Sequence, residues 1–374
     1  MTTEAEIVST LSAWANCESP SNDAARVNAM HDLVSQEIES SPAIRLQRIA
    51  GTAGVGDIVL LQAGPESDRT GLLLLAHVDT VHPVGTIDSA LPVRREGDRL
   101  YGPGLYDMKG GVFCAVRALR NVAAAGLSRP VTMLLSPDEE IGSPTTADRI
   151  RRLAETADVA LVVEPARAGG HAVTARKGVA WFEITTVGRP AHAGTHHADG
   201  RSAIRAACDL VRQLEGLTDY ELGTTVCVGE IRGGTARNVV PARCSFTVDV
   251  RVSKASEVER IQRTVSALDC GPDIAVTIGG GFNRPPFEKT SESAALLARA
   301  AAIAAGIGFS LTDVPMVGGG SDGNFVATAG VPTLDGLGVE GGGAHTNEEF
   351  MLLSSVTPRI ELLTRLLLDR SIGR

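Results

Sequence analysis

Residues Leu72–Thr80 read LLLLAHVDT, an apolar run that ends in polar side chains. The apolar run is typical of a strand that is buried on both faces, as in a parallel sheet. It delivers His77 and Asp79 two residues apart, and side chains at that spacing in an extended chain point to the same face. An imidazole and a carboxylate therefore meet at the carboxyl end of a strand, where open α/β sheets place their chemistry. Taken alone, the pair fits a structural His–Asp contact as well as a metal ligand with its carboxylate partner.

The length and composition indicate a two-domain protein. The chain has 374 residues, of which 43% are hydrophobic and 21% charged, and a single core stops growing near ~250–300 residues. A net charge of −9 argues against nucleic acid or an anionic membrane as a partner. No apolar run approaches the ~18–20 residues that span a bilayer, and no basic segment opens the chain, so we expect a cytoplasmic location. The six scattered cysteines, without a CxxC pair, fit reduced thiols.

The periodicity predicts one α/β domain that is interrupted by a smaller one. Apolar strands alternate with helical stretches in the first part of the chain, which predicts a mostly parallel sheet covered on both faces. The rhythm then changes to β-α-β-β-α-β, a ferredoxin-like unit, and the earlier style resumes near the end. We therefore expect a main α/β domain in two parts, 1–176 and 286–374, around an inserted domain at 177–285.

Further acids and a second imidazole lie where other strands are expected to end. Each acid alone is more often a helix cap or a solvated loop residue. Together with the His77–Asp79 pair they would repel one another unless cations neutralised them. Two imidazoles and several carboxylates without a thiolate suit zinc, cobalt or manganese, and their number fits two metals about 3.5–4 Å apart. The additional residues are Asp107, Glu139, Glu140, Glu164 and His345.

These segments resemble the signatures of the dizinc metallopeptidases and amidohydrolases that include glutamate carboxypeptidase, acetylornithine deacetylase, succinyl-diaminopimelate desuccinylase and aminoacylase. The resemblance spans about residues 70–350 and is nearest in style to glutamate carboxypeptidase. It is carried by HVDTV (77–81), GPGLYDMKGG (102–111), DEEIGS (138–143), VVEP (162–165), GRPAHAG (188–194), RNVVPARC (237–244), GGGSDGNF (318–325) and AHTNEE (344–349).

The resemblance implies two zinc ions in the main, catalytic domain, for which cobalt or manganese can substitute. Asp107 would bridge the two ions. His77 and Glu164 would complete one site, and Glu140 and His345 the other. The resemblance also implies that the peptide bond after Asp107 is cis.

Two further residues of this domain receive catalytic roles from the resemblance. Asp79 would orient His77 from behind the metal. Glu139 would be the general base for a metal-bridging water. The implied reaction is hydrolysis of the amide bond of a peptidyl or N-acyl amino acid that has a free carboxylate.

The same resemblance makes the inserted domain a lid and a dimerisation domain. His192 would cross a homodimer interface and donate to the oxyanion of the partner's site, where one such donor is worth ~2.7–4 kcal/mol. From the residues alone, His192 is as readily a surface loop histidine, and the preferred interpretation of Arg251 is a surface charge on a strand. Arginine suits recognition of a carboxylate because its fork is bidentate and always charged. The residues assigned to substrate binding are Asn238, Arg251, Arg284, Gly319 and Gly320.

Alternatives remain at this stage. The GGGSDG loop (318–323) matches G-x-G-x-x-G, the signature of a dinucleotide-binding oxidoreductase, although only about fifty residues follow it. A metal-binding module without catalysis is a second rival, and the free base Glu139 counts against it. Within the family, an N-acyl amino acid deacylase such as acetylornithine deacetylase or succinyl-diaminopimelate desuccinylase is the alternative to a carboxypeptidase. Two candidate carboxylate-binding arginines favour the carboxypeptidase.

Overall fold

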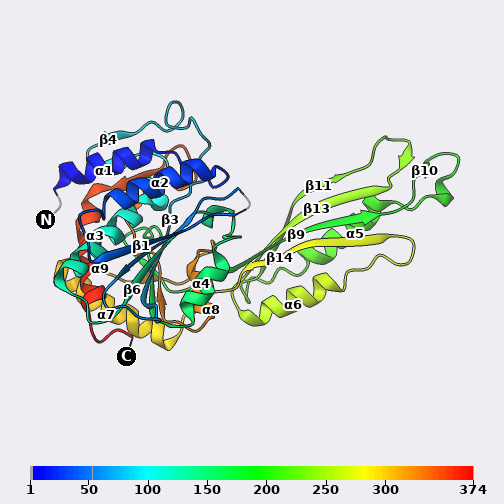
Figure 1. The fold of residues 1–374 in the computed structure, drawn as a ribbon. Helices are drawn as coiled ribbons and strands as arrows, with labels where there is room; N and C mark the ends of the chain where they lie inside the picture. The colour runs from blue at the N-terminus through cyan, green and yellow to red at the C-terminus, as the bar shows by residue number, and fades with distance from the viewer. Residues whose placement is uncertain (1–2, 53, 374) are drawn as a thin grey trace. The chain divides into compact units, whose positions relative to one another are not determined.

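The computed structural model describes residues 3–52 and 54–373, and the chain forms two compact units. The first unit contains the chain up to Ala175, then Lys289–Val317 and the residues from Ser321 onward. The second contains Arg176–Glu288 and Gly318–Gly320 (Figure 1). The glycine-rich loop is thereby divided, because Gly319 and Gly320 belong with the inserted unit and the serine after them does not.

A six-stranded sheet forms the centre of the first unit. Two pairs at one end of the sheet are antiparallel, and the other three pairs are parallel. The predicted parallel sheet is confirmed around LLLLAHVDT, and the carboxyl ends of its central strands share one edge. The strand order is β1 (Ile44–Ile49), β2 (Ile58–Ala63), β6 (Val131–Ser136), β3 (Gly71–His77), β7 (Ala157–Val162) and β16 (Thr333–Leu334).

Helices cover both faces of this sheet, which is why β3 is apolar at successive positions. Leu72 and Leu74 pack in one core with five helices, and Leu73 and Leu75 in another with two. Burial of each leucine stabilises the fold by about 1.5–3 kcal/mol. The first core uses α1 (Glu4–Asn16), α2 (Ala24–Gln36), α3 (Gly110–Ala125), α7 (Ser291–Ile307) and α9 (Leu353–Leu368), and the second uses α4 (Ala147–Ala154) and α8 (Gly323–Thr328) (Figure 1).

Short elements bring distant parts of the first unit together. Phe350 pairs with Tyr101, so the segments around residues 107 and 345 run side by side. β15 (Asp313–Val314) pairs in parallel with β8 (Ala172–Val173). The remaining elements are β17 (Gly341–Gly342), β18 (Phe350–Leu352), β5 (Arg99–Tyr101), β4 (Arg94–Glu96), the π-helical turn η1 (Leu105–Lys109) and the 3-10 turn η2 (Glu139–Ile141).

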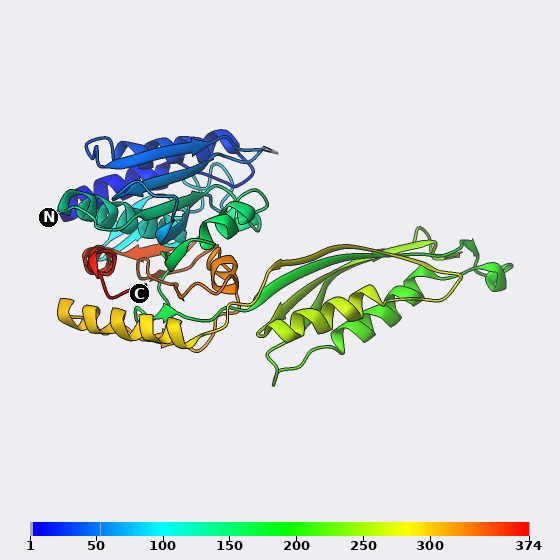
Figure 2. The ribbon, with the colours of Figure 1, turned by 60° about the horizontal axis from the view of Figure 1, so that its bottom comes forward.

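The inserted unit has the predicted β-α-β-β-α-β order. Its antiparallel sheet runs β11 (Thr225–Gly233), β13 (Arg243–Val252), β9 (Gly178–Val187) and β14 (Ala275–Arg284). Helices α5 (Ala203–Glu215) and α6 (Ala255–Ser266) lie on one face (Figure 2). Alternation along β9 places Phe182 under the helices and leaves Trp181 55% exposed on the open face. Further short elements are β10 (Ala191–His192), η3 (His197–Asp199) and β12 (Val239–Val240).

Two findings bear on the compositional expectations. Across residues 3–52 and 54–373, every helix is too short or too polar to cross a membrane. The six cysteines are all free thiols, in agreement with the absence of a CxxC pair.

Candidate metal centre

The carboxyl ends of three adjacent parallel strands supply most of the centre. His77 ends β3, Glu139 and Glu140 follow β6, and Glu164 follows β7. Nε2 of His77 lies 3.8 Å from Oε1 of Glu164. The structure therefore brings together the strand-end residues that the sequence pattern singled out.

Asp107 lies between two imidazoles. Its Oδ1 is 3.3 Å from Nε2 of His77, and its Oδ2 is 3.2 Å from Nε2 of His345. Nε2 of His345 is also 3.2 Å from Oε2 of Glu140. Two ligand atoms that are each ~2.0–2.1 Å from a tetrahedral zinc lie about 3.3 Å apart, so these spacings fit metal coordination. Each oxygen of Asp107 faces a different imidazole, as a bridging carboxylate requires.

The charges of this cluster call for cations. Burial would raise the pKa of Asp107, but hydrogen bonds from His345 and His77 hold it well below its usual range. Contacts with Asp107 and Glu140 raise the pKa of His345 to about 11. Burial opposes protonation of His77, yet Asp107 and Asp79 raise its pKa well above the usual value. Without metal, protonated imidazoles supply the positive charge that the carboxylates demand, and divalent cations fit the same donors.

Glu139 lies beside the His77–Glu164 pair. One ligand atom from each of these three residues lies within 4.8 Å of the others. The same holds for His77, Asp107 and Glu140. The Glu139 side chain is buried. Its closeness to the His77 ring suits either a metal ligand or a base next to a metal.

Asp79 lies behind the centre and supports it twice. Its backbone carbonyl oxygen is 3.0 Å from Nδ1 of His77, and its Oδ1 is 3.4 Å from the same nitrogen. A proton on Nδ1 leaves Nε2 for a ligand. The carboxylate also accepts hydrogen bonds from the backbone N–H groups of Glu139 (3.2 Å) and Glu140 (3.1 Å) and from the hydroxyl of Ser21 (2.6 Å). Asp79 thus holds the next turn of the site as well, a role that the sequence did not reveal.

Special backbone geometry accompanies the ligands. His345 has a φ of 63°, a left-handed conformation that is uncommon outside glycine and recurs at functional sites. The Asp107–Met108 peptide bond is cis, as the resemblance implied. A Cβ on Gly111 would lie 2.0 Å from the carbonyl oxygen of Val163. Only glycine therefore lets α3 begin directly against the segment that leaves β7 and carries Glu164.

The inserted unit brings His192 and Asn238 together. β10 pairs with β12, and the N–H of Ala193 donates to the carbonyl oxygen of Asn238 at 2.9 Å. Nδ1 of His192 accepts the backbone N–H groups of Gly194 and Thr195, both at 3.1 Å. The proton of a neutral ring is then on Nε2, and the exposed ring presents an N–H donor.

Arg251 has partners that the sequence did not predict. Its Nε and Nη2 each lie 2.9 Å from an oxygen of Asp249, two positions earlier on the same strand. Nη1 lies 3.4 Å from the carbonyl oxygen of Gly318. Asp249 therefore orients the guanidinium.

The other glycines of the loop rest on two buried arginines. Arg176 donates to the carbonyl oxygen of Gly319 at 3.3 Å. A Cβ on Gly320 would lie 2.5 Å from Cδ of Arg284, so the glycine permits this close approach. The dinucleotide hypothesis is wrong, because the helix after the loop, α8, has only 6 residues and cannot carry a doubly wound dinucleotide fold.

Comparison with known proteins agrees with this geometry. The profile of Peptidase family M20/M25/M40 matches residues 73–369. Carboxypeptidase G2 from Pseudomonas sp. (strain RS-16) is 28% identical over 378 residues, which cover 98% of this chain and 90% of that protein. Acetylornithine deacetylase from Myxococcus xanthus is 32% identical over 235 residues, which cover 59% of this chain and 60% of that protein.

Solved structures share the fold over nearly the whole chain. Aminopeptidase PepT from Bacillus cereus ATCC 10987 superposes with a TM-score of 0.74 at 20% identity, covering 98% of both chains. A Bacillus subtilis protein described as a dinuclear metal binding peptidase from the M20 family gives a TM-score of 0.69 at 14% identity, covering 98% of this chain and 97% of that one. By the profile match and this shared fold, the chain belongs to peptidase family M20/M25/M40 and is a hydrolytic enzyme of that family.

Proposed function

We propose that the chain is a two-metal hydrolase that cleaves the amide bond of a peptidyl or N-acyl amino acid with a free carboxylate. The observation that carries this proposal is the two-sided arrangement of Asp107, with one oxygen toward His77 and the other toward His345. A single metal would not need a second imidazole–carboxylate pair on the far oxygen. The similarity to carboxypeptidase G2 along 98% of the chain supports the substrate class.

The proposed ligand sets follow the measured spacings. Asp107 is shared, His77 and Glu164 would complete one site, and Glu140 and His345 the other. We propose zinc as the metal, with cobalt or manganese able to replace it. Bound divalent cations would polarise the scissile carbonyl and activate water.

Glu139 is proposed to move the protons. Its carboxylate takes a proton from the attacking water and then passes it to the amide nitrogen, so that the C–N bond breaks and a neutral amine leaves. The hydrogen bond from its own backbone N–H to Asp79 holds the turn in place. Burial of the side chain keeps bulk water from competing for the proton.

His192 is proposed to stabilise the oxyanion in the site of a second copy of the chain. Its Nδ1 is occupied by two backbone N–H groups, and this supports Nε2 as the donor. Asn238, on the paired segment, would reach across in the same way. A mixed dimer of one His192→Ala chain and one Glu139→Gln chain should recover activity if the histidine acts in trans.

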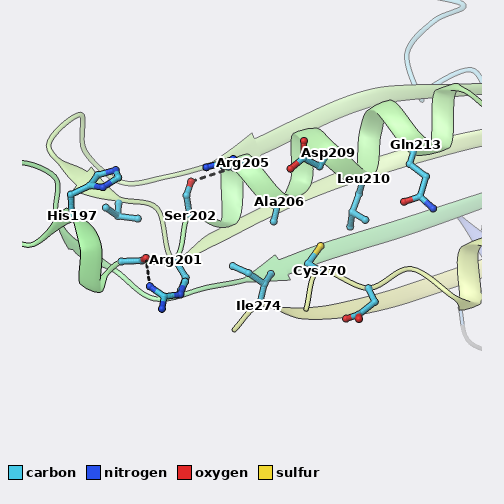
Figure 3. Close-up of a pocket in the computed structure, with 13 residues that line it drawn as sticks. His197, Arg201, Ser202, Arg205, Ala206, Asp209, Leu210, Gln213, Cys270 and Ile274 are labelled. Carbon is cyan, nitrogen blue, oxygen red and sulfur yellow. Dashed lines mark hydrogen bonds between the residues drawn. The ribbon is translucent and has the colours of Figure 1, made fainter. Parts of the chain in front are cut away.

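A groove on the inserted unit offers a surface for this dimer. It has a volume of about 580 Å³ and runs along α5 (Figure 3). Arg201 and Arg205 line it together with Asp209 and Asp269, and such a mixture of charges suits a self-complementary two-fold contact. Size-exclusion chromatography with light scattering tests the dimer. We further propose a cytoplasmic location, which the free cysteines support.

The substrate carboxylate is proposed to bind at the inserted unit. Arg251 and Arg284 would supply the charge, and Gly319 and Gly320 would form the adjacent wall. The contacts of the loop with Arg251 and Arg284 support this grouping, since the loop and the arginines form one cluster within the unit.

A deacylase is the second candidate, because acetylornithine deacetylase from Myxococcus xanthus is 32% identical over 235 residues. A hydrolysis screen of the zinc-loaded and cobalt-loaded enzyme against peptidyl-glutamates, acetyl-amino acids and succinyl-amino acids separates the two. We expect the highest kcat/KM with peptidyl or N-acyl glutamate. A preference for N-acetyl or N-succinyl derivatives of other amino acids would favour the deacylase. Bound metals with no hydrolysis would indicate a non-catalytic module.

A further inference from the structure

A buried carboxylate without a role in the proposed chemistry lies next to the metal centre. Glu349 is 1% exposed. Its Oε1 accepts the backbone N–H groups of Tyr106 at 2.9 Å and Asp107 at 3.0 Å. Its Oε2 accepts the N–H of Gly104 at 2.9 Å and lies 2.7 Å from Nε2 of His82. Both oxygens of one carboxylate thus converge on the turn that presents the bridging aspartate.

Glu349 connects ligand-bearing segments that are far apart in sequence. It lies four residues after His345, and its own carbonyl oxygen accepts the N–H of Gly102 at 3.4 Å. The following residues enter β18, which pairs with β5 just before the Asp107 turn. The third segment that Glu349 contacts contains His82, which lies three residues after Asp79. The Glu349 side chain therefore connects the segments around Asp107, His345 and Asp79.

The surroundings require a carboxylate and not merely a polar side chain. Three backbone N–H groups and a buried imidazole point at two oxygens. A glutamine offers one acceptor oxygen, and its NH₂ group would face donors in either orientation. Hydrogen bonds to an ionised acceptor are also shorter and stronger than those to a neutral one.

We propose that Glu349 is a positioning residue of the metal centre, with His82 as its support. It fixes the Gly104–Asp107 turn to the His345 loop, and this sets the 3.2 Å spacing between Oδ2 of Asp107 and Nε2 of His345. Groups that orient metal ligands typically contribute 10–100-fold to metal affinity. The inference rests on the two-metal function proposed above.

The test compares Glu349→Gln with Glu18→Gln. Glu18 is a matched control: it is buried in the same unit and accepts the backbone N–H groups of Gly85 at 2.8 Å and Ile87 at 3.2 Å, and both of these groups lie outside the Asp107 turn and the His345 loop. The dissociation constants of the two zinc ions are measured by chelator competition on the full chain. The unfolding midpoint of the metal-free protein and kcat and KM at saturating zinc are measured alongside.

We expect Glu349→Gln to lower the affinity for at least one zinc ion by about 10–100-fold. The variant should also lower kcat more than it raises KM. Glu18→Gln should leave both dissociation constants unchanged. His82→Gln, which keeps a donor, should bind zinc more tightly than His82→Ala. The His82 pair leaves the three backbone contacts intact and gives the same test if Glu349→Gln fails to fold.

Three results overturn the inference. The first is that Glu349→Gln binds both ions with wild-type affinity. The second is that Glu18→Gln lowers the zinc affinity as much as Glu349→Gln does. The third is that His82→Gln and His82→Ala bind zinc with the same affinity. In each case the proposed function stands if wild-type protein binds two ions and hydrolyses its substrate. Failure of the wild-type protein to bind two ions would instead refute the function on which the inference rests.

Discussion

The two units of the molecule carry opposite chemistry. In the first, carboxylates and two imidazoles lie 3.2–3.8 Å apart at one edge of a sheet, and their charge calls for cations. In the second, His192 and Arg251 present N–H donors, which suit an oxyanion and a carboxylate. We propose that the first arrangement carries out the reaction, and backbone hydrogen bonds to Glu349 hold the turn around its Asp107. In the second unit, we propose that His192 stabilises the oxyanion and that Arg251 and Arg284 bind the substrate carboxylate.

Glu139→Gln should give the largest effect and break the chemistry of the first unit alone. We expect turnover to fall by roughly 10²–10⁴-fold, the typical contribution of a general base, while both metals stay bound. Steady-state kinetics and elemental analysis of the same sample measure this. Glu140→Gln is the matched control, since it should lose metal as well as activity. A Glu139→Gln protein that loses a metal would mean that Glu139 is a ligand.

His192→Ala should show that the second unit contributes to the transition state. We expect kcat to fall by about 10²–10³-fold, as when one oxyanion donor is removed, with KM nearly unchanged. His196→Ala, an exposed histidine in the same loop with its side chain 70% exposed, is the control and should behave as wild type. A change in KM alone would assign His192 to substrate binding.

Arg284→Lys should separate substrate choice from chemistry. A bidentate arginine cannot be replaced by a lysine without loss, and hydrogen bonds to charged groups contribute about 1.5–3 kcal/mol. We expect KM to rise by about 10–100-fold for a substrate with a free carboxylate, and no change for its carboxamide analogue. Equal effects on both substrates would show that the buried arginine acts only through the fold.

His31→Leu should sharpen the comparison within the first unit, because His31 is buried without the carboxylates that surround His345. Burial lowers its pKa to about 4, so its stabilising effect is complete above pH 6.5 and is lost as the pH falls toward 4. Between pH 7 and 5 this loss is on the order of 2 kcal/mol. Urea unfolding in the presence of a chelator measures the free energy of unfolding at each pH. Between pH 7 and 5, this free energy should fall less in His31→Leu than in wild type. The same pH dependence of the free energy of unfolding in both proteins would show that His31 does not titrate as burial predicts.

Much of the first unit follows from the sequence, because its candidate ligands lie at fixed positions relative to apolar strands. LLLLAHVDT (72–80), VTMLLS (131–136) and DVALVVE (158–164) are apolar runs of strand length, and parallel strands end at one edge of a sheet. The brace by Glu349 does not follow, since nothing local connects AHTNEE to the turn around Asp107. The pairing of Arg251 with Asp249 was also missed, because a strand pattern gives the face of a side chain but not its partner.

The metal content of wild type and Asp107→Asn shows whether one carboxylate holds two metal ions. Elemental analysis of both proteins, dialysed against the same trace of zinc, gives the number of ions per chain. We expect two ions in wild type and the loss of both in the variant, because one carboxylate serves both sites. One ion or none in wild type, or two retained in Asp107→Asn, would contradict a bridged pair of metals at this centre.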